Sequence, residues 1–490
     1  MMKKKSLILM WAIIISGTTF LIGNKIKDLK TPTTTPPTQN IIKEESLVSE
    51  NNPEETQNES TKTFAEHIRE GDKLFANYYY KSAISEYKKA IEKNPNEILA
   101  YKRLAETYLK NNEPEFAEEN FKKALVFSPN SNDLKLGIAR AYLNQNNTED
   151  AKKIIWDIPE THLEARYYQG ISMILYEKYD DAIKIFNELV KNSETSQSIK
   201  NKSENFIKTK ETIELYAKDD KLFAKLYYFY TLSINDEYIS AIPHLFSIIN
   251  EKNNYRDAWI VLGYSYLRAN KLNEAIDSLI KARDLDPEKA ETSFYLGIAY
   301  FSNNEIEKAV YYLQKAQSLN FKNKDLLDLK LAEVYNARND FEKSEAKYNE
   351  LLNRGNTEIT IFENIINLNL EKLNNPKKAF EIAENLYKKH PEEAKTHLLL
   401  SKIYINTNNL KHAKSFLNYA LNLDQTNPEI YFYMGKISEI ENKHSVAKEY
   451  YQVAISLGYH EEIAKKSLDR INIINSFLNN KSYQVNLLNQ

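Results

Sequence analysis

The chain has 490 residues, with 66 Lys and Arg against 68 Asp and Glu, a formal net charge of −2 and no cysteine. This near-neutral balance offers no basic face for nucleic acid, and the lack of cysteine excludes disulfides, thiolate catalysis and cysteine metal sites. Only 10 Gly and 13 Pro occur beside 42% hydrophobic residues, a composition that fits helices joined by short turns.

The first 23 residues predict a membrane-targeting segment. Residues 1–5, MMKKK, form a basic N-terminus, and residues 6–23, SLILMWAIIISGTTFLIG, carry no charge. An uncharged run of 18 residues exceeds the roughly 7–15 apolar residues of a signal peptide and fits the roughly 17–25 of a spanning helix. The length favours an uncleaved transmembrane signal anchor, with a cleaved signal peptide as the alternative.

The flanking charges bear on orientation. Three lysines precede the apolar run, and Lys25, Lys27 and Lys30, offset by Asp28, follow it. The positive-inside tendency favours a cytoplasmic N-terminus with the rest of the chain in the periplasm. Because the Lys, Asn and Ile bias suggests an A+T-rich bacterium, we expect a single-pass protein of the bacterial inner membrane.

Residues 24–63 predict a flexible linker. The stretch 31–63, TPTTTPPTQNIIKEESLVSENNPEETQNESTKT, is poor in aromatics and rich in Thr, Pro, Asn and Glu. Such a composition cannot bury enough apolar surface to fold, so we expect a disordered tether.

From residue 64 onward the chain repeats with a period of 34 residues. Counting from residue 256, the large, small and proline positions of one unit are occupied by Trp259, Leu262, Gly263, Tyr266, Ala275, Leu279, Ala282 and Pro287. The next unit repeats them with Leu296, Gly297, Tyr300, Ala309, Leu313 and Ala316. Since a glycine inside a helix costs roughly 0.5–1 kcal/mol, its recurrence predicts that Gly263 lets another helix approach closely.

This pattern resembles the tetratricopeptide repeat (TPR), of a membrane-anchored bacterial type. The resemblance implies an all-α fold, a right-handed superhelical α-solenoid of about eleven helix pairs. Repeats one to four then occupy residues 64–196 and repeats five to eleven occupy 222–461. The individual units are 64–97, 98–131, 132–162, 163–196, 222–255, 256–289, 290–323, 325–358, 360–393, 394–427 and 428–461.

Three units depart from the pattern. The third is short and has Ile158 where an alanine belongs, the eighth has Ser344 and Leu351 at small-residue positions, and the ninth has Asn367 in place of glycine or alanine. A solenoid grows by stacking, so this length permits one domain where about three globular ones would otherwise be expected.

The turns between helices use asparagine where glycine would be usual. The pairs are Asn111-Asn112, Asn146-Asn147, Asn303-Asn304 and Asn408-Asn409. Because asparagine tolerates the left-handed conformation that closes many helices, we expect it to do so here.

Residues 197–221 interrupt the repeats, with a helix expected around 204–217. One interpretation is an extra helix or loop beside the stack. The other is a segment that bends the superhelix or folds over its concave groove.

After the last repeat, residues 462–490 predict a capping helix and tail. Its apolar residues recur at helical spacing: Ala464, Leu468, Ile471, Ile474 and Leu478.

No pattern of catalytic residues is found. The eight histidines are dispersed, His390 and His397 belong to different repeats, and no phosphate-binding loop or nucleophile motif occurs. We therefore expect a non-enzymatic protein without cofactor or metal.

The resemblance implies a binding surface as well. In TPR proteins, positions 2, 5, 9 and 12 of each repeat line a concave groove. In repeats four to seven these positions give a mostly apolar wall: Tyr167, Ile171, Ile174, Phe223, Leu226, Tyr230, Ile260, Tyr264, Leu267, Phe294, Ile298 and Phe301.

Some TPR proteins bind a C-terminal carboxylate with Lys and Asn at positions 5 and 9 of consecutive helices. That arrangement is absent here, since Lys102 at position 5 is followed by Glu106 at position 9. The wall therefore predicts a groove for an apolar or aromatic peptide or helix. The alternative is a groove filled by superhelical packing or by residues 197–221.

Two functions follow from the resemblance. The first is a membrane-anchored scaffold that binds a protein or peptide partner at the cell envelope. The second is a structural or assembly subunit packed permanently in a homo- or hetero-oligomeric envelope complex, for which self-association is expected. A fold does not specify a function, so the partner is not identified.

Overall fold

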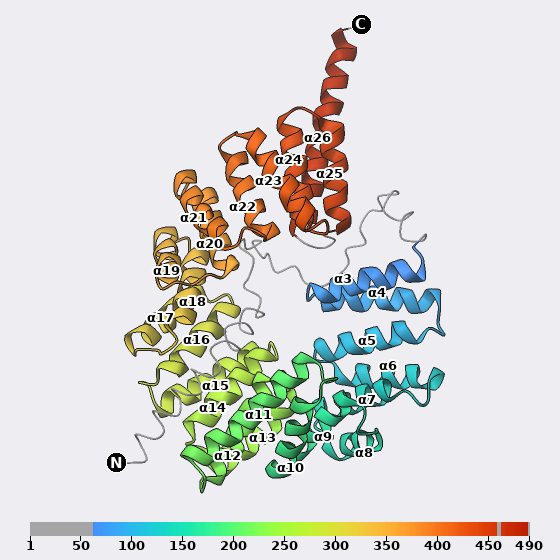
Figure 1. The fold of residues 1–490 in the computed structure, drawn as a ribbon, viewed down its shortest axis with the longest axis vertical. Coiled ribbons are helices and arrows are strands. Elements are labelled where there is room, and N and C mark those ends of the chain that lie inside the picture. The colour runs from blue at the N-terminus through green and yellow to red at the C-terminus, as the bar shows by residue number, and fades with distance from the viewer. Residues whose placement is uncertain (1–61, 458–461, 489–490) are drawn as a thin grey trace. The chain divides into compact units, whose positions relative to one another are not determined.

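The computed structural model of the chain describes residues 62–457 and 462–488. These residues form 24 α-helices and no strand, an all-α solenoid (Figure 1). The basic N-terminus, the apolar run 6–23 and nearly all of the linker lie outside the described residues, so their predictions remain untested. Among the helices that are described, none is long and apolar enough to cross a membrane.

The chain divides into two compact units, an N-terminal unit that ends at Ala337 and a C-terminal unit that begins at Arg338. The division falls inside the predicted eighth repeat, 325–358, where Ser344 and Leu351 break the pattern of small residues. The described residues therefore form two units, each a helical stack with its own core.

The helices of the N-terminal unit are α3 (Phe64–Ala76), α4 (Tyr80–Lys93), α5 (Ile98–Lys110), α6 (Pro114–Phe127), α7 (Asn132–Asn144), α8 (Thr148–Asp157), α9 (Leu163–Leu175), α10 (Tyr179–Lys191), α11 (Gln197–Tyr216), α12 (Lys221–Ile234), α13 (Tyr238–Glu251), α14 (Arg256–Arg268), α15 (Leu272–Leu285), α16 (Ala290–Ser302), α17 (Ile306–Ser318) and α18 (Lys324–Ala337). Those of the C-terminal unit are α19 (Phe341–Asn353), α20 (Ile359–Glu371), α21 (Pro376–Lys389), α22 (Ala394–Asn406), α23 (Leu410–Leu423), α24 (Pro428–Ile440), α25 (His444–Leu457) and α26 (Glu462–Leu488).

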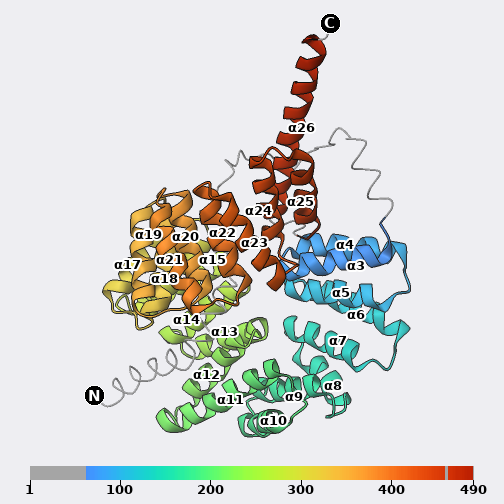
Figure 2. The same ribbon diagram turned by 45° about the horizontal axis from the view of Figure 1, so that its top comes forward.

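The helices follow the predicted repeats. Within each unit, consecutive helices pack as pairs, and each pair contacts the next (Figures 1 and 2). The third repeat is short because α8 has only 10 residues and ends at Asp157. Ile158 follows as the C-cap residue and is buried, so it fills the space that a longer helix would have covered.

Gly263 is a packing residue, as predicted. A Cβ atom at this position would lie 2.5 Å from Leu279 Cγ on the paired helix α15, and one at Gly297 would lie 2.6 Å from Leu313 Cγ on α17. The second repeat has Ala105 at this position, and its large residue Phe121 lies against Gly137 of the next repeat instead. The small residue therefore makes room for the large side chain of the second helix.

The asparagine turns are confirmed. Asn112, Asn146, Asn304 and Asn408 have φ between 58° and 62°, in the left-handed region. This conformation ends the first helix of a repeat and turns the chain into the second with little of the steric cost that most residues carry there.

The interruption between repeats four and five is an extra helix of the stack, α11, which starts at Gln197, earlier than expected. Its Phe206 is fully buried and stacks on Phe186 of α10, with ring centroids 4.5 Å apart. The Thr209 hydroxyl lies 2.6 Å from that of Thr231 on α12. These contacts support the interpretation of an added helix beside its neighbours.

Helix α26 packs on α24 and α25. Ala464 and Ile474 are buried and Ile471 is partly buried against the same core, which fits the expected cap. Leu468 and Leu478, also expected on the covering face, are 51% and 36% exposed. The covering face of α26 is thus narrower than the sequence pattern predicts.

Candidate binding site

The twelve residues predicted to line the groove lie on four first helices, α9, α12, α14 and α16. Every one of them is buried: Tyr167, Ile171, Ile174, Phe223, Leu226, Tyr230, Ile260, Tyr264, Leu267, Phe294, Ile298 and Phe301. The most exposed, Tyr230, keeps only 6% of its surface. These residues therefore form no exposed apolar wall in this structure, and their contact with a partner remains a prediction.

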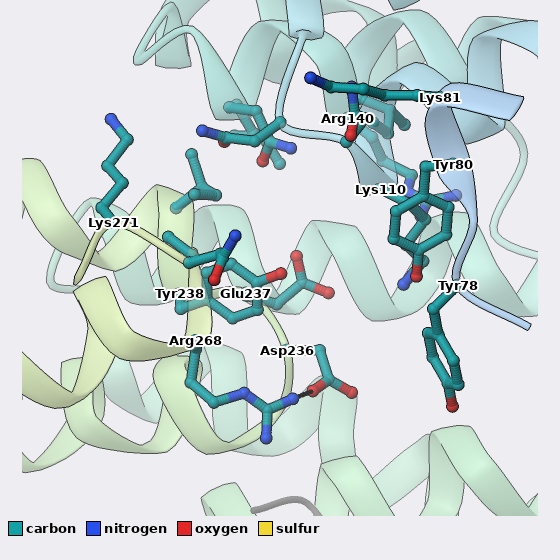
Figure 3. Close-up of a pocket in the computed structure, with 18 of the residues that line it drawn as sticks. Tyr78, Tyr80, Lys81, Lys110, Arg140, Asp236, Glu237, Tyr238, Arg268 and Lys271 are labelled. Carbon is teal, nitrogen blue, oxygen red and sulfur yellow. Dashed lines mark hydrogen bonds and ion pairs between the residues drawn. The ribbon is translucent and has the colours of Figure 1, made fainter. Parts of the chain in front are cut away.

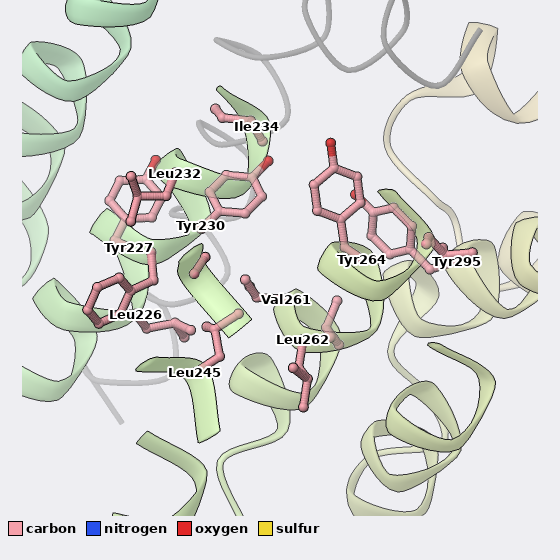
Figure 4. Packing of buried hydrophobic residues seen from close by; sticks show 14 of the residues in the cluster. Leu226, Tyr227, Tyr230, Leu232, Ile234, Leu245, Val261, Leu262, Tyr264 and Tyr295 are labelled. Atoms are coloured by element: carbon pink, nitrogen blue, oxygen red, sulfur yellow. The ribbon is translucent and has the colours of Figure 1, made fainter. Parts of the chain in front are cut away.

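Packing between neighbouring first helices accounts for part of this burial. Tyr230, Tyr264 and Tyr295 stand side by side on α12, α14 and α16 (Figure 4). Their ring centroids are 6.3 Å and 5.6 Å apart, within the range of favourable aromatic pairs. The rings therefore pack against one another along the stack, which is the kind of contact expected in the alternative of a wall filled by superhelical packing.

A further contact joins helices that are not neighbours in the chain. Helix α13 packs against α7, two repeats earlier in the chain. The Arg140 guanidinium lies 5.6 Å from the centre of the Tyr168 ring, and the Tyr168 hydroxyl donates a 2.9 Å hydrogen bond to Glu237. Burial raises the pKa of Tyr168, which keeps its hydroxyl protonated and able to donate. Arg140 of repeat three, Tyr168 of repeat four and Glu237 of repeat five are thus linked by side-chain contacts.

Beside this bridge lies a cavity of about 930 Å³, here named the turn cavity because the turns between helices form much of its wall. Its residues come from the α3–α4 turn, the end of α5, α7, α9, α11, the α12–α13 turn and the α14–α15 turn. Figure 3 shows Lys110 and Tyr80 on one side of the space, with Glu237, Arg268 and Lys271 on the other. The turns of repeats one, two, five and six therefore meet around one space within the N-terminal unit.

Positive charge dominates the wall of the turn cavity. Six lining residues are basic and three are acidic, the basic ones being Lys81, Lys110, Arg140, Lys202, Arg268 and Lys271 and the acidic ones Glu164, Asp236 and Glu237.

The acidic residues lie close to only some of the basic residues. Asp236 pairs with Arg268 at 3.0 Å and lies 3.9 Å from Lys202. Glu164 lies 3.8 Å from Arg140. All three acidic residues are engaged by these neighbours or by Tyr168, which leaves an excess of cations.

Three lysines make up this excess. Lys81, Lys110 and Lys271 are exposed at the cavity surface, and no carboxylate among the described residues lies within 4.0 Å of their ammonium groups. Desolvation, reinforced by the nearby charge of Arg140, lowers the pKa of Lys110. An anion in the cavity would offset both effects.

Two residues with an unusual backbone conformation also line the turn cavity. Twelve non-glycine residues in the described part of the chain have positive φ, and nine are asparagine. The other three are Tyr78, Glu177 and Asp236, and two of these, Tyr78 and Asp236, line the turn cavity. Tyrosine tolerates this conformation less well than asparagine, so its presence at φ 64° is unusual.

The sequence pattern did not predict the turn cavity, because its wall combines turns with residues of α5, α7, α9 and α11 that lie outside the constrained positions of the repeat. One signal was available, since Tyr78 and Asp236 stand where the other turns carry asparagine. Within residues 62–457 and 462–488, no group of three His, Asp or Glu side chains is arranged to hold a metal ion.

Known proteins offer a comparison for this fold. Solved structures with similar folds include the APC/C hetero-tetramer Cut9–Hcn1, at 12% identity and a TM-score of 0.35, covering 85% of this chain and 98% of that chain. Yeast Tom70 has 14% identity and a TM-score of 0.36, covering 86% and 96%. A tetratricopeptide repeat protein from Parabacteroides merdae ATCC 43184 has 17% identity and a TM-score of 0.40, covering 54% and 98%. Among curated proteins, no match to the sequence is found.

Four family models described as tetratricopeptide repeat match the sequence. The matched segments are 86–119, 114–174, 164–196, 260–321 and 371–433. They fall in both structural units and overlap the repeats assigned from the 34-residue period. The chain therefore contains tetratricopeptide repeats.

Proposed function

We propose that the protein is a non-enzymatic interaction scaffold, held at the bacterial inner membrane by residues 6–23, with its repeats in the periplasm. The repeats support a role in binding other proteins, and the uncharged 18-residue run after MMKKK supports the anchor. The observation that carries the proposal is the turn cavity, a polar space of about 930 Å³ with three unpaired lysines. A cavity of this size is at the upper end of the roughly 300–1,000 Å³ typical of binding sites.

Crosslinking in living cells tests the scaffold. Tyr78, which lines the turn cavity and is 49% exposed, is replaced in the full chain by a photoreactive phenylalanine derivative. The control carries the same group at Tyr311, which is 59% exposed on α17 away from the cavity. A discrete protein trapped from position 78 and not from 311 supports the scaffold. Equal crosslinking from both positions, or none from 78, contradicts partner binding at this cavity.

Fractionation tests the anchor and the location. The full chain should remain with membranes after alkaline extraction, and a variant lacking residues 6–23 should be released. Added protease should digest the repeats of the full chain in spheroplasts if they are periplasmic. Release of the full chain, or protection of its repeats, would contradict the anchor or the orientation respectively.

The C-terminal unit favours a second candidate, a subunit that self-associates. Ile473 and Phe477 lie one helical turn apart on α26 and are 50% and 52% exposed, although such residues are usually covered. Sedimentation velocity over a concentration series tests this candidate. A dimer that dissociates in Phe477→Ser supports the assembly subunit, whereas a monomer at all concentrations favours the scaffold.

A further inference from the structure

The wall of the turn cavity indicates the chemistry of its ligand, and this inference rests on the proposed function. Lys81 comes from the first repeat, Lys110 from the second and Lys271 from the sixth, so the three cations surround the space from separate turns. Cations brought near one another without counter-charges repel, and the repulsion is strongest where walls exclude water. A ligand with several negative charges would relieve it.

A negatively charged ligand would reduce repulsion most at Lys110, because of the residues that surround it. Arg140 and Lys202, the basic neighbours that contribute to lowering its pKa, belong to the same wall. Asp236 and Glu237, which oppose the shift, are engaged by Arg268 and Tyr168 at 3.0 Å and 2.9 Å. No described carboxylate is therefore left over to pair with Lys110.

The size and the aromatic edge of the cavity favour a peptide over a small anion. A volume of about 930 Å³ exceeds what one phosphate or carboxylate would fill, and the three lysines come from different repeats. Tyr78 and Tyr79, in the α3–α4 turn at the edge of the cavity, are 49% and 38% exposed. Exposed tyrosines of this kind are common where proteins bind peptides, since the ring packs on apolar atoms while the hydroxyl bonds polar ones.

We propose that the turn cavity binds an acidic segment of a partner protein, with carboxylates paired to Lys81, Lys110 and Lys271 and the segment packed on Tyr78 and Tyr79. This site is formed by turns together with residues of α5, α7, α9 and α11, and none of the twelve buried residues predicted to line the groove belongs to its wall. The charge of the wall sets the specificity, because a neutral or basic segment would leave the lysines uncompensated.

Fluorescence anisotropy with the purified full chain in mild detergent tests the proposal. The probe is a labelled ten-residue peptide of alternating Glu and Ala, and the matched peptide has Gln in place of Glu. We expect binding of the Glu peptide alone, and loss of affinity as salt is raised. Each of Lys81→Gln, Lys110→Gln and Lys271→Gln should weaken binding by about 3- to 10-fold, the range for partly exposed charge pairs.

Lys281→Gln is the control, since Lys281 is exposed on α15 of the same unit and does not line the turn cavity. Equal binding of the Glu and Gln peptides, or an equal effect of Lys281→Gln, would overturn the proposal. Displacement of the peptide by millimolar inorganic phosphate, with no dependence on peptide length, would also overturn it in favour of a small-anion site.

The chain has one acidic stretch of its own, with six glutamates between residues 44 and 59. A full-length variant with these six glutamates changed to Gln distinguishes an acidic segment of this chain from one supplied by a partner protein. If the Glu peptide binds this variant and not the unchanged chain, the chain's own acidic segment occupies the cavity. The proposal that a partner protein supplies the acidic segment is then overturned. A partner crosslinked from position 78 without binding of the Glu peptide would refute the acidic ligand and leave the scaffold standing.

Discussion

Replacing Gly263 with alanine tests whether the small positions of the repeat are set by packing. The new Cβ would lie 2.5 Å from Leu279 Cγ, 2.9 Å from Leu279 Cδ2 and 3.3 Å from the carbonyl oxygen of Ala275. Carbon atoms pack best at roughly 3.5–4.0 Å, so the Leu279 side chain would have to retreat by about 1 Å. Leu279 is fully buried and is met at its branching Cγ atom, and Ala275 is met at its backbone, so we expect α15 itself to shift.

The two opposing contributions can be compared. Alanine gains about 1 kcal/mol over glycine in helix propensity. Overpacking a core typically costs about 1–3 kcal/mol. We expect the overpacking to exceed the gain, so that Gly263→Ala destabilises the N-terminal unit by up to about 2 kcal/mol.

Urea denaturation of the full chain measures this change, followed by tryptophan fluorescence because Trp259 lies on the same helix as Gly263. The midpoint should fall in Gly263→Ala. Adding Leu279→Ala to it should cost less than Leu279→Ala does in the unchanged chain, because the new methyl group partly fills the space vacated. A midpoint that rises in Gly263→Ala would refute the packing role, since propensity alone would then decide the effect.

Three further predictions concern α11 and the turn cavity. Phe206→Ala should destabilise the N-terminal unit by about 3–5 kcal/mol, as for a buried aromatic residue. Leu215→Ala on the same helix, where Leu215 is 71% exposed, should change the urea midpoint little. Equal effects of the two substitutions would contradict the packing of α11. Lys110→Gln should raise the melting temperature at pH values below the lowered pKa of Lys110, where the folded state alone carries the desolvation and repulsion that disfavour its charge. That gain should shrink as pH rises through the lowered pKa toward the ordinary value of about 10.4, and the same gain in Lys281→Gln would contradict its origin in the cavity. Tyr78→Asn should raise the free energy of unfolding by up to roughly 1 kcal/mol, and with it the urea midpoint, because asparagine tolerates the φ of 64°. A lowered midpoint would mean that contacts of the Tyr78 ring outweigh the backbone cost.

Much of the fold could be predicted from the sequence because it depends on interactions between residues close in the chain. Gly263 meets Leu279 only 16 positions later, and Asn112 and Asn304 act within single turns. The repeat pattern therefore predicted helix pairs, their packing residues and their turns. The start of α11 was predicted too late in the chain, because α11 lies between two repeats and no constrained repeat position indicates where it begins.

The binding site could not be predicted in the same way. The twelve first-helix positions carry apolar side chains in the sequence, and nothing local distinguishes an open wall from a packed one. In the structure all twelve are buried, and for Tyr230 and Tyr264 the packing of their rings along the row with Tyr295 accounts for part of that burial.

The sequence by itself determined the repeat, its small and large packing positions, its asparagine turns and the apolar run that predicts an anchor. Only the tertiary structure decided that Lys81 and Lys271, 190 positions apart, line one cavity with Lys110. The reason is that the curvature of a solenoid accumulates from small rotations between neighbouring repeats, which α11 interrupts. Each rotation is set by side-chain packing at one interface, so which distant turns meet depends on all the interfaces between them.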